Sequence, residues 1–209
     1  MAGARLLVAS SNRHKLEEFR ELAAGSGLTL DFLPGFDSLA AFDESAETFA
    51  ENAAGKAIHY SLVTMECVMA DDSGLVVPAL GGAPGVRSSR YAGPEGDAGR
   101  NIRKLLEALA GKKGQGREAR FVCVLALARA GRVEAVFSGA VAGTILEVPR
   151  GAGGFGYDPI FLHEPAGKTF AELSREEKNR LSHRGRAFSK LVAYLKESPQ
   201  GDSPARRNA

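Results

Sequence analysis

Apolar positions in the first half of the chain form two patterns, unbroken runs and runs with three- or four-residue spacing. The unbroken runs predict strands over residues 6–9, 29–33 and 67–70, with residues 75–77 continuing the third strand after a bend. Helical spacing begins at Leu16, and Ser11 or Asn12 would cap that helix. A second helix is predicted over residues 48–64. Alternation of strands and helices in this order favours an α/β fold.

The second half of the chain contains more strands. Residues 121–128 and 133–142 predict a hairpin that turns at Ala130-Gly131, and residues 143–148 predict another short strand. Helices are predicted over residues 101–110, 175–180 and 183–196. The whole pattern predicts an α/β fold with a mixed sheet, in a single domain over residues 1–197. Residues 198–209 contain no apolar residue beyond alanine, which predicts a disordered tail.

Composition excludes several classes of protein. Apolar residues make up 44% of the chain and charged residues 25%, which excludes a disordered chain and a coiled coil. A formal charge of +2 gives no support for nucleic-acid binding. No apolar run approaches the roughly 20 residues of a membrane-spanning helix. Cys67 and Cys123 lie in apolar runs without zinc-ligand spacing, so we expect buried, reduced thiols in a cytoplasmic protein with no membrane partner.

The first predicted strand is followed by a polar segment suited to an anion. Residues 10–15 read Ser-Ser-Asn-Arg-His-Lys, where the strand passes into a helix. Main-chain N–H groups and the helix dipole favour phosphate at such a point. Asn12 can donate to a phosphate or a base, and Lys15 lies one helical turn further on. A helix cap followed by a surface lysine explains the same residues, so both interpretations stay open.

Two adjacent carboxylates follow the third predicted strand. Asp71 and Asp72 come directly after its apolar residues, and Ser73-Gly74 comes next. Adjacent carboxylates at the end of a buried strand repel each other unless a cation or a proton intervenes. Mg²⁺ bound jointly by carboxylates and phosphate oxygens meets that need. An Asp-Ser-Gly turn explains Asp72 but gives Asp71 no role, so the pattern favours a magnesium and phosphate site.

Glycines surround one aromatic residue in the segment 151–159. Phe155 could stack on a base, because glycines allow the main chain to approach a flat ligand; the alternative is a phenylalanine packed in the core. Further along, Lys178, His183 and Arg184 supply donors for a keto oxygen or a phosphate. A solvated basic helix surface is the other interpretation of that stretch.

Six motifs in order along the chain resemble the inosine/xanthosine triphosphate pyrophosphatase family (dITP/XTP diphosphatase). They are Ser10-x-Asn12-x-x-Lys15-x-x-Glu18, Glu44-x-x-x-Thr48-Phe49-x-Glu51-Asn52-Ala53, Ala70-Asp-Asp-Ser-Gly-Leu75, Gly81-Gly-Ala-Pro-Gly85 with Ser89-Arg90-Tyr91, Gly153-Gly-Phe-Gly-Tyr-Asp-Pro159 and Ser182-His-Arg184. Each motif alone is weak, but six in the right order are specific. Where the family often has Thr-Gly-Asn, this chain has Ser10-Ser11-Asn12, which keeps the hydroxyl.

The resemblance implies a fold and an activity. The implied fold is an elongated α/β structure with a central mixed sheet flanked by helices, two lobes around a nucleotide cleft, and a homodimeric state. The implied activity is Mg²⁺-dependent hydrolysis of deaminated purine nucleoside triphosphates (ITP, dITP, XTP) to the monophosphate and pyrophosphate. Such a reaction cleanses the nucleotide pool.

The resemblance also assigns roles to residues. Asp72 is the expected general base and holds the metal with Glu44, while Asp43 or Asp71 stay open as alternative ligands. The expected phosphate-binding residues are Ser10, Ser11, Asn12, Arg13, His14, Lys15 and Lys56, with Ser73 nearby. The residues expected around the base are Phe155, Gly156, Tyr157, Asp158, Lys178, His183 and Arg184.

Two other functions stay open on the sequence. One is a nucleotide-binding regulator without hydrolytic activity, and the other is a pyrophosphatase for other modified nucleotides. The paired aspartates favour an enzyme over a regulator, because a binding protein has no need of a general base beside a metal ligand.

Overall fold

The structure, a computed structural model, describes residues 5–10 and 12–197; Ser11 and the predicted tail over 198–209 lie outside the described residues. Seven strands of the described residues form one sheet in the order β2-β1-β3-β4-β5-β6-β7. Their bounds are β1 (Arg5–Val8), β2 (Thr29–Phe32), β3 (Val68–Val76), β4 (Glu118–Arg129), β5 (Arg132–Ile145), β6 (Phe161–His163) and β7 (Lys168–Thr169). β1 pairs in parallel with β2 and β3, and the other neighbours are antiparallel, so the predicted mixed α/β sheet is confirmed.

Helices cover both faces of the sheet. They are α1 (Arg13–Ala23), α2 (Phe49–Ser61), α3 (Ala98–Ala108), α4 (Arg175–Leu181) and α5 (His183–Glu197). Successive side chains of a strand point to opposite faces. Leu6 and Val8 of β1 therefore pack with α1 and α5, whereas Leu7 packs with α2 on the other face.

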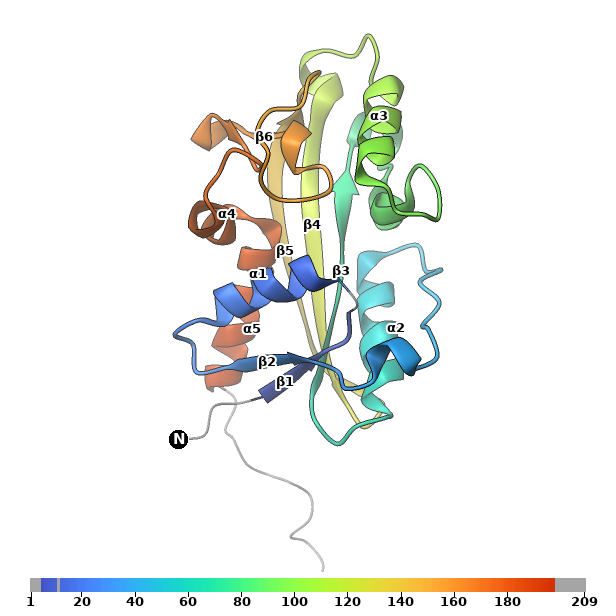
Figure 1. Cartoon of the computed structure of the whole chain (residues 1–209), viewed down its shortest axis with the longest axis vertical. Coiled ribbons are helices and arrows are strands. Elements are labelled where there is room, and N and C mark those ends of the chain that lie inside the picture. The colour runs from blue at the N-terminus through green and yellow to red at the C-terminus, as the bar shows by residue number, and fades with distance from the viewer. Residues whose placement is uncertain (1–4, 11, 198–209) are drawn as a thin grey trace, which may run out of the picture.

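Three long strands join two ends of an elongated molecule (Figure 1). β3, β4 and β5 run along its length; β1, β2, α1 and α2 form a lower lobe, and β6, β7 and α3 an upper lobe (Figure 1). β1 pairs with β3 at Val68 and Met69. From Ala70 to the isolated bridge at Val76, the described residues give β3 no strand neighbour on that side. This unpaired edge faces the space between the lobes.

Most predicted elements are confirmed, and the differences have physical causes. β3 continues without a bend through Asp71 and Asp72, because β4 pairs with all of its nine residues. Of the strand predicted over 143–148, residues 143–145 are the end of β5 and residues 146–148 are not in a strand; the two-residue β7 was not predicted. The hairpin turn is confirmed, since Ala130 and Gly131 have φ angles of 48° and 77°, the left-handed values of a tight hairpin turn.

Three other expectations concern the chain as a whole. The single domain over residues 1–197 stays a prediction. Cys67 and Cys123 are buried and free, as expected. Each helix in the described part of the chain is too short or too polar to span a membrane.

Candidate active site

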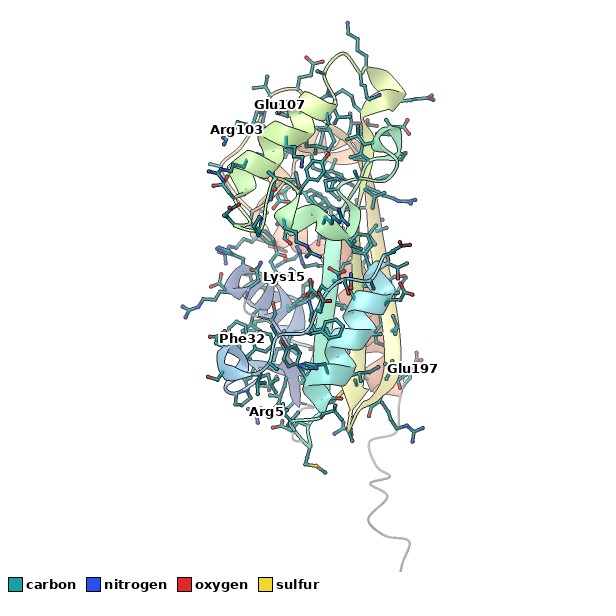
Figure 2. The ribbon with its side chains drawn as sticks, turned by 90° about the vertical axis from the view of Figure 1, so that its right-hand side faces the viewer. Arg5, Lys15, Phe32, Arg103, Glu107 and Glu197 are labelled. Atoms are coloured by element: carbon teal, nitrogen blue, oxygen red, sulfur yellow. The ribbon has the colours of Figure 1, made fainter. Side chains whose placement is uncertain are left out.

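A cavity of about 650 Å³ lies between the lobes, within the size range of small-molecule sites. Lys15, which lines the cavity, is labelled in Figure 2. It lies below Arg103 and Glu107 of the upper lobe and above Phe32 and Arg5 of the lower lobe. Fourteen of the predicted site residues line the cavity, namely Ser10, Asn12, His14, Lys15, Glu44, Lys56, Asp72, Ser73, Phe155, Gly156, Tyr157, Asp158, His183 and Arg184. Residues more than 170 positions apart in the sequence thus meet in one cleft. We call this cavity the cleft.

The N-terminus of α1 opens into the cleft. Asn12 caps the helix, because its side chain accepts a hydrogen bond from the Lys15 N–H at 3.2 Å. The Ser10 hydroxyl oxygen in turn accepts from the Asn12 N–H at 3.1 Å. The helix begins with N–H groups that have no acceptor within the helix, and its dipole favours an anion there. The cap interpretation is therefore correct, and it also creates the geometry of a phosphate site.

The three residues that follow Asn12 lie in different surroundings. Arg13 is exposed and lines a neighbouring hollow with residues 32–38 rather than the cleft, so the prediction that it binds phosphate is not supported by its position. His14 stacks on Phe155 with ring centroids 5.8 Å apart, so it belongs to the aromatic end of the cleft. Lys15 extends along the cleft and forms an ion pair with Asp71 at 2.8 Å.

Asp71 and Asp72 lie within β3 and on its opposite faces, which corrects the prediction that both follow the end of a strand. Residues alternate sides in a strand, so Asp71 shares its face with Ser73, whose hydroxyl donates to it at 3.1 Å. Burial raises the pKa of Asp71, but Lys15, Lys56 and Arg184 outweigh burial and lower it to about 2. Asp71 is therefore an ionised partner of Lys15, and its role as an alternative metal ligand stays a prediction.

Asp72 faces the cleft from the other side of β3. Burial is the main cause that raises its pKa to about 6; Glu44 raises it further, while the Asn52 amide and the nearby lysines lower it. Its Oδ2 accepts from the Asn52 amide at 3.1 Å. A carboxyl group with a pKa near neutrality can take a proton from water and release it again, which is the requirement for a general base.

Glu44 lies in the loop that precedes α2. Its carboxylate contacts the ammonium group of Lys56, and Arg90 of the upper lobe donates to its main-chain oxygen at 2.7 Å. Lys56 also donates to the main-chain oxygen of Asp71 at 3.1 Å. Burial lowers the pKa of Lys56, but Asp71 and Glu44 outweigh burial and raise it, so the ammonium group stays charged in the cleft.

The donor set of Glu44 and Asp72 fits a magnesium ion. In the part of the chain that the structure describes, no group of three His, Cys, Asp or Glu side chains forms a complete ligand set. Mg²⁺ commonly takes one or two carboxylates and completes its shell with water and substrate phosphate. Glu44 and Asp72 line one cleft, and repulsion from Glu44 adds to burial in raising the pKa of Asp72. A divalent cation between them would remove that repulsion.

Phe155 lies at the other end of the cleft, half-buried at its wall. The Nζ of Lys178 and the guanidinium of Arg184 lie 4.8 and 4.9 Å from its ring centroid. These two cations and the stacked ring of His14 hold the Phe155 ring in place. Phe155 is half-buried and lines the cleft, so the alternative of a phenylalanine inside the core does not fit, while stacking of a base on its ring stays a prediction.

Lys178 and Arg184 are buried, so the interpretation of this stretch as a solvated basic surface is wrong for them. Glu18 of α1 holds both, with its carboxylate 2.7 Å from Lys178 and 3.0 Å from Arg184. Asp158 forms a second ion pair with Lys178 at 2.6 Å. A Cβ atom at Gly185 would overlap the main-chain oxygen of Asn179, so only glycine allows this close turn between α4 and α5.

His183 is buried and neutral. Burial, followed by the positive charge of Arg184, lowers its pKa well below the usual value, and its ring stacks on Phe121 at 4.7 Å. Within the described residues, His183 Nδ1 and Arg184 Nε are buried without a hydrogen-bond partner. Asp71 Oδ1 and His163 Nδ1 also lack a partner, but only His183 and Arg184 of these four residues line the cleft, which makes them candidates for contact with a polar ligand edge.

Three residues that build the site were absent from the sequence-based candidates: Glu18, Asn52 and Arg90. Each lies in one of the six family motifs, and that position is the feature of the sequence that could have identified it. Tyr157 was a candidate, but its buried hydroxyl donates to the main-chain oxygen of Ser88 at 2.9 Å and joins two segments of the upper lobe.

The fold and the cleft together define an α/β protein whose polar cleft has paired carboxylates and ammonium groups at one end and an aromatic ring with buried cations at the other. The chain belongs to the Ham1 family, because the family model matches residues 6–194. This finding confirms the family that the motifs indicated.

Individual relatives agree with this assignment. The chain is 49% identical over 192 residues to the dITP/XTP pyrophosphatase of Geobacillus kaustophilus, which covers 92% of this chain and 94% of the relative. It is 50% identical over 188 residues to the dITP/XTP pyrophosphatase of Gloeobacter violaceus, covering 90% and 92%. The solved structure of a HAM1 protein from Coxiella burnetii matches with a TM-score of 0.83 and 42% identity, covering 93% of this chain and 100% of that one.

Proposed function

We propose that this protein hydrolyses deaminated purine nucleoside triphosphates (ITP, dITP and XTP) to the monophosphate and pyrophosphate, in a Mg²⁺-dependent reaction that cleanses the nucleotide pool. The observation that carries the proposal is the division of the cleft into two ends. Carboxylates and ammonium groups face a polyanion at one end, and Phe155 with its cations faces a flat base at the other. Close relatives named dITP/XTP pyrophosphatases support the same substrates.

The phosphate end would be held by α1, α2 and β3. N–H groups at the start of α1, with Ser10 and Asn12, would bind phosphate oxygens, and Ser73 lies nearby. Lys15 and Lys56 each present an ammonium group with three donors, of which their carboxylate partners use only part. Ser11, also predicted to bind phosphate, lies outside the described residues. Arg13 is not included among the proposed phosphate-binding residues, because it lines another hollow.

Hydrolysis would use the two carboxylates of the cleft. Bound at Glu44 and Asp72, Mg²⁺ would supply positive charge for the phosphates and activate water. Asp72 would accept the proton of the attacking water, which its position in the cleft allows. Lys15 and Lys56 would stabilise charge that develops on the phosphate oxygens.

Base selection would use the buried donors near Phe155. The 6-keto group of hypoxanthine or xanthine accepts a hydrogen bond, whereas the 6-amino group of adenine donates one. Arg184 and His183 line this end of the cleft with polar atoms that lack partners among the described residues. A donor there would bind the keto base and stay unpaired against adenine, which costs binding energy.

The products of dITP test the proposal. We expect incubation with Mg²⁺ to give the deoxynucleoside monophosphate and pyrophosphate, identified by ³¹P nuclear magnetic resonance, and we expect a chelator to stop the reaction. Release of orthophosphate and a diphosphate would contradict the proposed bond cleavage. Tight dITP binding without any product would favour the regulator instead.

Replacing Lys15 with alanine is expected to raise KM for dITP tenfold or more, because a charge-assisted hydrogen bond contributes roughly 1.5–3 kcal/mol. Binding of the nucleoside, which carries no phosphate, should change far less. Lys15→Arg keeps the charge and should restore part of the affinity, and Lys113→Ala on the exposed surface serves as the control. Unchanged KM and kcat/KM in Lys15→Ala would show that this lysine only pairs with Asp71.

We also propose a homodimer in the cytoplasm. Leu62, Val63 and Met65, between α2 and β3, are exposed at 68%, 56% and 86%. Val133 and Val136 of β5 are exposed as well, and exposed apolar groups are a common feature of subunit contacts. Free buried cysteines suit a reducing compartment. Sedimentation equilibrium, which separates one chain from two, tests the dimer.

A further inference from the structure

Asn52 connects two parts of the candidate active site that come from different segments. It lies near the start of α2 with its side chain 0% exposed. Its amide nitrogen donates to Asp72 Oδ2 at 3.1 Å and to the main-chain oxygen of Ala46 at 3.2 Å. Its amide oxygen accepts from the Ala46 N–H at 3.1 Å. Both donors and the acceptor of the carboxamide are therefore in use.

These bonds determine which way the carboxamide of Asn52 faces. Rotation by 180° would place its carbonyl oxygen against the Asp72 carboxylate and its NH₂ group against the Ala46 N–H. Both contacts would then join like groups, acceptor to acceptor and donor to donor. Asn52 can consequently occupy one orientation only, and it holds Asp72 in one position relative to the loop.

The same loop carries Glu44. Ala46 lies two residues after Glu44, and both of its main-chain polar groups bond to Asn52. Of the side-chain hydrogen bonds within the described residues, only those of Asn52 reach both this loop and Asp72. One amide group thus links the Asp72 carboxylate to the main chain of the loop, while Lys56 contacts the Glu44 carboxylate itself.

The part of α2 that carries Asn52 is held in place by a helix cap and by close packing. Thr48 caps α2 by accepting from the Glu51 N–H at 3.2 Å, so the first turn of the helix is fixed. A Cβ at Gly55 would overlap the ring of Phe42, which shows how closely the loop packs on the helix. Groups held on helices keep their positions more precisely than groups on loops.

We propose that Asn52 is a positioning residue that fixes the Asp72 carboxylate relative to the loop that carries Glu44, so that both carboxylates can bind one divalent cation. The inference rests on the proposed function, since it concerns the same site. Residues that hold metal ligands through hydrogen bonds commonly contribute about 10- to 100-fold to metal affinity or activity. Asn52 itself touches neither the metal nor the nucleotide in this proposal.

Two substitutions test the inference. Asn52→Leu has a similar size but can neither donate to Asp72 nor bond the Ala46 main chain, and Asn52→Ser is smaller and uncharged. We expect each to weaken Mn²⁺ binding to the nucleotide-free protein, followed by electron paramagnetic resonance, about 10- to 100-fold. We also expect kcat for dITP to fall at least about tenfold with a smaller change in KM, and excess Mg²⁺ to restore part of the loss.

Ser61→Ala is the matched control. Ser61 lies on the same helix, is also 0% exposed, and bonds the Gly131 N–H at 2.9 Å at the far end of the lower lobe. Its loss should lower the unfolding temperature without changing Mn²⁺ affinity or kcat. Circular dichroism of all variants identifies any that fail to fold, and the folded member of the Asn52 pair then decides.

Unchanged Mn²⁺ affinity in a folded Asn52 variant would overturn the inference, as would an effect equal to that of Ser61→Ala. Loss of nucleotide affinity without loss of Mn²⁺ affinity would also overturn it, because it would assign Asn52 to the substrate instead. Failure of the proposed function has a different signature: the wild-type protein would then leave dITP intact, while the Mn²⁺ measurement still reports on Asn52.

Discussion

Replacing Asp72 with asparagine is expected to reduce kcat for dITP by at least about 10²-fold, while nucleotide binding persists. General bases contribute about 10²–10⁴-fold to turnover, and the loss of a metal-binding charge adds to this. Asparagine has nearly the same shape, and Asp72 is packed against β4 and Asn52, so the fold should tolerate the change. Steady-state kinetics and calorimetric binding of dITP measure the two quantities separately.

Asp43→Asn provides the control for Asp72 and tests the alternative metal ligand. Asp43 is next to Glu44 in sequence, but it is exposed and lines the hollow beside the cleft. We therefore expect near wild-type turnover from Asp43→Asn. If Asp72→Asn keeps more than roughly a tenth of wild-type kcat, Asp72 is not the general base. A large loss in Asp43→Asn would assign the metal to that carboxylate.

The pH dependence of the wild-type protein follows from the same group. Burial and Glu44 raise the pKa of Asp72 to about 6 in the metal-free cleft, and a general base works only when it is deprotonated. At sub-saturating Mg²⁺, kcat/KM for dITP should therefore fall as pH drops below about 6. Saturating Mg²⁺ should move this fall to lower pH, because a bound cation favours the carboxylate.

Removing the buried donors beside Phe155 is expected to narrow the preference for ITP over ATP. Arg184→Ala and His183→Ala should each lower the ratio of the two kcat/KM values about tenfold, mainly by loss of activity on ITP. A buried donor left without an acceptor costs about 1–3 kcal/mol. Its removal loses the hydrogen bond to the keto oxygen of ITP and also removes the cost of the unpaired donor in the ATP complex. Parallel kinetics on the two triphosphates measure the ratio.

Two further variants make the selectivity test specific. Arg184 is paired with Glu18, so Arg184→Lys, which keeps the charge, separates the donor geometry from the ion pair. Arg180→Ala removes an exposed arginine from the neighbouring helix and should leave the ratio unchanged. Equal losses on ITP and ATP in both alanine variants would assign these residues to the phosphates and contradict a role in base reading.

The order of strands and helices could be predicted because apolar spacing is a local property. The continuation of β3 through Asp71 and Asp72 could not, because it depends on pairing with β4, about 50 residues away in the chain. A polar stretch after an apolar run suggests the end of a strand. Here the stretch stays extended because the partner strand supplies its hydrogen bonds.

The candidate site shows the same division between local and long-range information. The cap at Asn12 depends on neighbours within a few residues, and it was predictable. The burial of Lys178 and Arg184 was not, because their charges are balanced by Glu18, 160 and 166 positions away. The sequence offered these basic residues as donors for a keto oxygen or a phosphate, but only the structure shows which acidic group makes their burial possible.

Hydrolysis rates across a panel of nucleoside triphosphates test the central claim most directly. Pyrophosphate release should be measured at one Mg²⁺ concentration for ITP, dITP and XTP, for the four common ribonucleotides, and for modified pyrimidine triphosphates. The account predicts kcat/KM values for ITP, dITP and XTP that exceed the value for ATP by about tenfold or more, the size of one stranded buried donor. Equal values across the panel, or the highest value for a pyrimidine, would contradict it.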